Sequence, residues 1–80
     1  MDRANTLTPR ELETLTLVAK GLTYGEVAQE MGIAWHTVKH HLEHVRDALG
    51  AQNTRYAIDI ATATGLLPSQ ETQEEVAEYV

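Results

Sequence analysis

Residues 23–50 read TYGEVAQEMGIAWHTVKHHLEHVRDALG, and this stretch predicts two helices joined by a tight turn. Thr23 and Glu26 have the spacing of a capping box, so a short helix is expected to begin there and to end at Gly32. Beyond the turn, apolar residues recur at the spacing of one helical face: Val38, Leu42, Val45 and Leu49. A longer helix is therefore expected over about residues 35–49, and the pair has the pattern of a helix-turn-helix.

The flanking sequence predicts one helix before this pair and one after it. TPRE at residues 8–11 combines a hydroxyl cap, a proline at the first helical position and a glutamate that can return a hydrogen bond. This pattern predicts a helix over about residues 9–20. Asn53 or Thr54 can cap a further helix that runs to about Thr64. The sequence has no strand-like alternation, so the expected fold class is all-α with four helices.

The last of these helices carries apolar residues on two sides. Ile58 and Ile60 are two positions apart, which separates them by about 200° around a helix. Both cannot face the same core, so one of them is expected to be free for a partner.

The composition limits what the chain can be. Eighty residues with 42% hydrophobic side chains suit one small domain with a single core. Cysteine is absent, which excludes disulfides, thiolate nucleophiles and cysteine-ligated zinc. The sequence shows no glycine-rich phosphate loop and no serine close to a histidine, so no catalytic residue and no cofactor is predicted. No apolar run approaches the roughly 18 residues of a membrane span, and a cytoplasmic protein without a membrane partner is expected.

The net charge of −6 is unevenly distributed. Residues 1–67 contain eight acidic and six basic residues, which gives −2, and residues 68–80 contain four acidic residues and no basic one, which gives −4. Most of the acidity therefore lies in a C-terminal tail, and the rest of the chain is close to neutral.

Several motifs occur together in an order typical of one family. LTPRE at residues 7–11 is followed by GLT at 21–23, EVA at 26–28, TVK-x-H at 37–41 and LG at 49–50. In this order the chain resembles the DNA-binding domain of the LuxR-type (GerE-like) transcription regulators, in the stand-alone form. The resemblance covers about residues 7–67, between an N-terminal arm (1–6) and the acidic C-terminal tail (68–80).

This resemblance implies roles for the predicted helices. Helices two and three would form the unit that reads double-stranded DNA, with helix three in the major groove. Helix four would pair two copies of the chain, and its expected dimerisation residues are Ile58, Ala61, Thr62 and Gly65.

The chain departs from the family pattern at positions that would lie near DNA. Ala34 stands where the family usually has a serine that caps the recognition helix. Glu43 and Ala48 occupy positions where relatives often carry basic residues, and Tyr24-Gly25 replaces a polar or basic pair. These changes remove positive charge. DNA binding is therefore expected to be weaker than is typical of the family, or to be directed to a different DNA sequence.

All four histidines lie within WHTVKHHLEH, residues 35–44. A rotation of about 100° per residue from the centre of the apolar stripe places three of them on the outward side of the helix, beside Glu43: His36, His40 and His44. Thr37, Lys39 and Arg46 flank the stripe, and His41 lies at its edge, where a half-buried structural histidine is expected.

The outward residues suit the recognition of base pairs. Lys39 can donate to guanine, a neutral histidine can donate or accept, and Glu43 can accept from the cytosine amino group. Thr37 and Arg46 can reach phosphates. The predicted DNA-binding residues are thus Thr37, Lys39, His40, Glu43, His44, Arg46 and His36.

The spacing of the same histidines also raises the possibility of a metal site. His36, His40 and His44 are four residues apart, so neighbouring pairs could chelate zinc weakly. The face is convex and offers no closing ligand, so no metal site is predicted.

Two functions follow from these observations. The first is a dimeric, sequence-specific transcription regulator, with a homodimer as the expected state. The alternative is an acidic protein-binding module that pairs with another regulator through helix four, as a heterodimer, and does not bind DNA itself.

Overall fold

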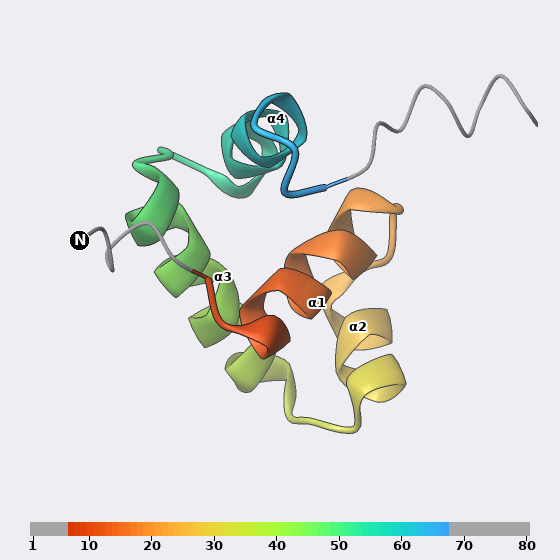
Figure 1. Cartoon of the computed structure of the whole chain (residues 1–80). Coiled ribbons are helices and arrows are strands. Elements are labelled where there is room, and N and C mark those ends of the chain that lie inside the picture. The colour runs from red at the N-terminus through yellow and green to blue at the C-terminus, as the bar shows by residue number, and fades with distance from the viewer. Residues whose placement is uncertain (1–6, 68–80) are drawn as a thin grey trace, which may run out of the picture.

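The structure, a computed structural model, describes residues 7–67. This part of the chain folds into four helices and contains no strand, which confirms the predicted all-α class. The helices are α1 (Pro9–Ala19), α2 (Tyr24–Met31), α3 (Trp35–Leu49) and α4 (Thr54–Ala63). Figure 1 shows α1 between α2 and α3, with α4 above them. The predicted arm (1–6) and acidic tail (68–80) lie outside the described residues.

Three of the four helices begin at a side-chain cap. Thr8 and Thr23 each form a complete capping box, in which the threonine hydroxyl accepts from the backbone of Glu11 or Glu26 at 3.1 Å. Asn53 accepts from the backbone N–H of Tyr56 at 2.8 Å and caps α4. These bonds satisfy N–H groups that the first turn of a helix leaves free, and they explain why the predicted starts agree with the observed ones.

Helix α3 begins without such a cap. Ala34 occupies its N-cap position in an extended conformation and offers no side-chain acceptor. The helix must therefore be held by its packing, and α3 does pack against α1, α2 and α4.

Gly32 and Gly50 end α2 and α3 in the left-handed conformation, with φ of 69° and 68°. Each turn is closed by a backbone bond of the Schellman type, from Ile33 N to Ala28 O at 3.0 Å and from Ala51 N to Arg46 O at 2.8 Å. A residue with a Cβ would be strained at these angles. The two glycines thus fix where the two helices of the helix-turn-helix end.

The core is assembled around α3. Its apolar stripe is buried as predicted: Val38 and Val45 have no exposed surface, Leu42 is 1% exposed, and Leu49 packs at the edge. Leu15 of α1 and Val27 of α2 complete the centre of the core. Since every other helix buries its apolar face against α3, the position of α3 is set on three sides.

Helix α4 contacts the core through small residues, and this corrects one prediction. Ala57 and Ala61 are fully buried, so Ala61 cannot belong to a dimer surface. Ile58 also packs against the core. Ile60, on the opposite flank of α4, is half-buried and is not among the described side chains that pack there. Of the two isoleucines, Ile58 is thus the one that packs against the core within residues 7–67.

None of the four described helices combines the length and the apolar character that crossing a bilayer requires.

Candidate nucleic-acid interface

One side of α3 is bordered by the first residues of α2 and α4. The Tyr24 ring of α2 lies 5.7 Å from the Trp35 ring of α3, measured between centroids, with a tilt of 48°. The Tyr24 hydroxyl is 3.5 Å from Oγ1 of Thr54 in α4, and a guanidinium nitrogen of Arg46 donates to the same oxygen at 3.5 Å. We call this side, made by Tyr24, Trp35, Lys39, Arg46 and Thr54, the basic side of α3.

Within the described residues, no carboxylate pairs with the positive charges on the basic side. Neither Lys39 nor Arg46 forms an ion pair within residues 7–67, and Lys39 is exposed. Arg10 and Arg55, by contrast, pair with Glu13 at 3.2 Å and with Asp59 at 3.6 Å. Two cations with no carboxylate partner in residues 7–67, beside the N-termini of two helices, make a surface suited to an anionic ligand.

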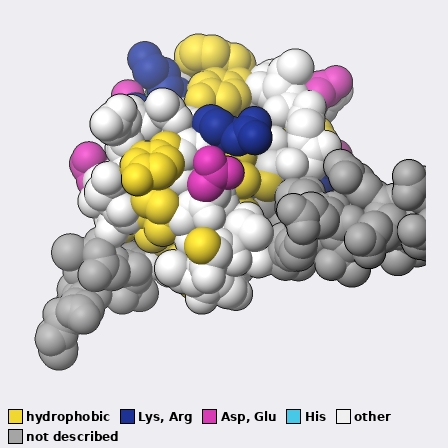
Figure 2. Space-filling view, turned by 90° about the horizontal axis from the view of Figure 1, so that it is seen from above, with side chains coloured by type: hydrophobic (Ala, Val, Ile, Leu, Met, Phe, Trp, Pro, Cys, Tyr) yellow, Lys and Arg dark blue, Asp and Glu magenta, His cyan; other side chains and the backbone are white. Residues whose placement is uncertain are grey.

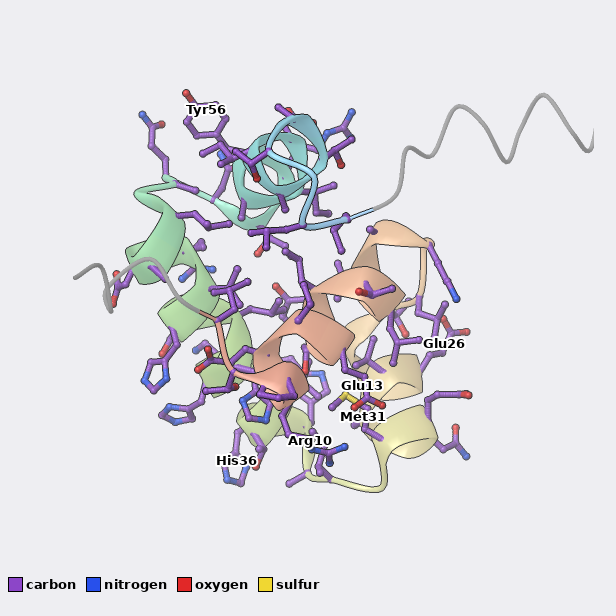
Figure 3. The ribbon with its side chains drawn as sticks, in the orientation of Figure 1. Arg10, Glu13, Glu26, Met31, His36 and Tyr56 are labelled. Carbon is purple, nitrogen blue, oxygen red and sulfur yellow. The ribbon has the colours of Figure 1, made fainter. Side chains whose placement is uncertain are left out.

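Arg10 is occupied elsewhere in the fold. Besides its pair with Glu13, it donates to the carbonyl oxygen of Met31 at 3.4 Å. Figure 3 shows Arg10, Glu13 and Met31 together where α1 meets α2. This arginine therefore joins two helices and does not add to the basic side.

The opposite side of α3 faces α1, and His44 lies there. Its Nδ1 is 3.2 Å from Oε2 of Glu11, a residue that is only 8% exposed. The other oxygen of this carboxylate accepts from the backbone N–H of Thr8 at 3.1 Å. His44 was predicted among the DNA-binding residues. Its side chain is 67% exposed, and its Nδ1 is directed to Glu11 of α1, a neighbour that helical phase alone does not identify.

His36, His40 and Glu43 lie between the two sides and point outward. The His36 and His40 rings stand 6.3 Å apart at 79°, and His40 Nδ1 is 3.9 Å from Glu43 Oε1. No group of three or more potential ligands is placed to hold a metal ion anywhere in residues 7–67. In Figure 3, His36 lies at the opposite end of the domain from Tyr56 of α4.

Thr37 and His41 are half-buried, and His41 has the environment expected of it. Along α3, Thr37 lies within about 20° of His44 and therefore on the flank that faces α1. Figure 2, which looks onto α4 from above, shows no histidine among the coloured atoms of that face.

Sequence comparison agrees with the motif pattern and the fold. The model of the family described as "Bacterial regulatory proteins, luxR family" matches residues 5–61. The chain belongs to this family. The match covers α1, α2 and α3 entirely and α4 as far as Ala61. The resemblance predicted from the motifs is therefore confirmed.

Three relatives of this luxR-family chain are described as transcriptional activators. The chain is 45% identical over 62 residues to the HTH-type transcriptional activator RamA of Corynebacterium glutamicum, which covers 78% of this chain and 22% of RamA. It is 43% identical over 61 residues to the transcriptional activator protein YukR of Yersinia ruckeri, covering 76% of this chain and 27% of YukR. With the activator CarR of Pectobacterium carotovorum the identity is 43% over 63 residues, covering 79% of this chain and 26% of CarR. The chain thus spans about a quarter of the length of these relatives.

Three residues of the basic side were not among the predicted site residues: Tyr24, Trp35 and Thr54. The sequence did contain a signal for two of them. Tyr24 replaces a polar family residue, and Thr54 follows a recognisable N-cap. Trp35 is close to the apolar stripe in helical phase, which favours burial, yet it is 53% exposed in this luxR-family domain.

Proposed function

We propose that this domain binds double-stranded DNA and regulates transcription, with α3 in the major groove. The observation that carries the proposal is the pair of cations, Lys39 and Arg46, which have no carboxylate partner within residues 7–67. They lie on the side of α3 that the first turns of α2 and α4 border. The match to the luxR family and the similarity to a transcriptional activator support the proposal that this surface binds DNA.

The arrangement suggests a division of roles. Lys39 is exposed and one helical turn from the start of α3, where it can donate to guanine. Arg46 and the hydroxyl of Thr54 share a hydrogen bond at the start of α4, which suits a phosphate. His36, His40 and Glu43 remain as base-reading residues on the outward face. We assign Thr37 and His44 to the α1 flank instead.

Titration against mixed-sequence duplex DNA tests the function. Binding should appear at about 50 mM salt and weaken by more than about tenfold at about 200 mM, because counterions are released when cations meet phosphates. Fluorescence anisotropy of a labelled duplex measures the affinity at each of the two salt concentrations. No binding at the lower salt would contradict the proposal and leave the alternative, an acidic module that pairs with another regulator.

We further propose that the domain acts as a dimer through α4. Tyr56, Ile60 and Ala63 recur at the spacing of one helical flank, and Tyr56 is 49% exposed. Figure 2 shows hydrophobic patches on the face over α4, interrupted by charged side chains. Of the residues predicted for this role, Ile58, Thr62 and Gly65 lie on the other flank of the helix, and Ala61 is inside the core.

Ile60→Glu should abolish the dimer, because it would place a charge in an apolar contact between two copies. Sedimentation or light scattering at about 100 µM protein should show a dimer for the parent chain and a monomer for the variant, with unchanged helical circular dichroism. Asp59→Ala, on the solvent side of α4, is the matched control and should remain dimeric. A parent chain that is monomeric under these conditions would refute the α4 assignment.

A further inference from the structure

An exposed aromatic pair stands at the start of the helix-turn-helix. Trp35 is the first residue of α3 and the only tryptophan in the chain, and 53% of its surface is exposed. Tyr24 is the first residue of α2 and lies against it, with 5.7 Å between ring centroids. Covering so large an apolar ring is favourable in water, so the pair is a surface that a ligand with an apolar group can use.

The pair is held in place before any ligand binds. Tyr24 is half-buried and packs against the core, and its hydroxyl lies 3.5 Å from Thr54 of α4. The indole of Trp35 therefore lies against a ring that is itself held by the core and by a contact with α4. A contact made by such a side chain loses little conformational freedom on binding.

The chain neighbours of the pair are mixed: Ala34 and Gly25 carry no polar side chain, whereas Thr23 and His36 do. Ala34 precedes Trp35, and Gly25 follows Tyr24, with open space beside it apart from the Thr23 hydroxyl. Lys39 lies one turn beyond Trp35 on the same side of α3, about 40° away. The basic side thus has two parts. Its end at the N-terminus of α3 carries the aromatic pair, and the part beyond it carries the charges of Lys39 and Arg46.

We propose that the Trp35–Tyr24 pair recognises the 5-methyl group of thymine in the major groove. This inference rests on the proposed DNA-binding function and specifies part of it. Among the groups that the major groove presents, this methyl is the apolar one, and the others are hydrogen-bond donors or acceptors. An apolar ring next to Lys39 would therefore select thymine beside a guanine that the lysine reads.

The test removes the methyl groups and nothing else. Duplexes selected by the protein from a random pool are resynthesised with deoxyuridine in place of every thymidine, and affinities for the two forms are compared by anisotropy. The parent chain should bind the uridine form about fourfold less tightly for each methyl group that the indole buries. Because Trp35 is the only tryptophan, its own emission should also be quenched more strongly by the thymidine duplex.

Two variants at Trp35 make the comparison specific. Trp35→Ala should bind both forms with equal affinity, and Trp35→Phe should keep most of the difference. Lys39→Ala is the matched control: it should weaken binding to both forms by the same factor, so the ratio stays that of the parent. Circular dichroism checks that each variant is folded.

The results separate this inference from the function on which it rests. Equal binding of the two forms by the parent, with clear DNA binding, would overturn the thymine assignment and leave the DNA-binding function intact. If Trp35→Ala showed the same ratio of thymidine to uridine affinity as the parent, the thymine assignment to this pair would also be overturned. The methyl contact would then belong to another residue. If no duplex is bound at low salt, the function and the inference fail together.

Discussion

Leu42→Ala is expected to lower the free energy of unfolding by about 2–5 kcal/mol, the range for truncating a buried leucine. Leu42 is 1% exposed at the middle of α3, the helix against which all three others pack. The change removes apolar contacts and leaves a cavity that the backbone cannot easily fill. In a domain of this size the loss is a large share of the whole stability, so partial unfolding at room temperature is expected.

Urea denaturation followed by circular dichroism at 222 nm measures this effect. Leu66→Ala is the matched control, because Leu66 is 40% exposed in the turn after α4. It should cost less than about 1 kcal/mol. Equal losses for the two variants would mean that α3 is not the centre of the core.

Lys39→Ala is expected to weaken DNA binding by about 10- to 100-fold and to reduce the salt dependence. Lys39 is exposed on the basic side and pairs with no carboxylate of residues 7–67, so its charge is available to DNA. The measurement is an anisotropy titration at several salt concentrations.

Lys20→Ala is the matched control for this change. Lys20 is another exposed lysine, but it lies at the C-cap of α1, away from the basic side. Its removal should leave affinity within about twofold, since only a distant, screened charge is lost. Equal effects of the two variants would show that binding responds to net charge and not to this surface.

The sequence was sufficient to predict the four helices because their ends are specified locally. The threonine caps at Thr8 and Thr23 and the glycines at 32 and 50 act within one turn of the chain. The apolar stripe of α3 could be predicted for the same reason, since a helix needs one continuous face toward its core. None of these features depends on contacts between distant residues.

It was harder to predict from the sequence which neighbouring helix each flank of a helix contacts. Helical phase gives the angle between side chains but does not identify their neighbours. Arg46 flanks the apolar stripe and His44 lies on the outward side, but helical phase alone does not show that His44 contacts α1 and that Arg46 contacts α4. In α4, Ile58 and Ile60 lie on opposite flanks, and only the packing decides which faces inward. The buried Ala57 and Ala61, four residues apart, were the available signal that small residues form the inner face.

The Glu11 carboxylate has a consequence for how α3 can move. One of its oxygens holds the first turn of α1 through Thr8, and the other holds His44 on the back of α3. If α3 turned about its own axis by one residue, about 100°, the imidazole would leave this carboxylate and the Arg46 contact to α4 would break as well. Together with the buried stripe of α3, these two contacts hold its roll angle, so the direction in which Lys39 points depends in part on α1, which lies outside the helix-turn-helix.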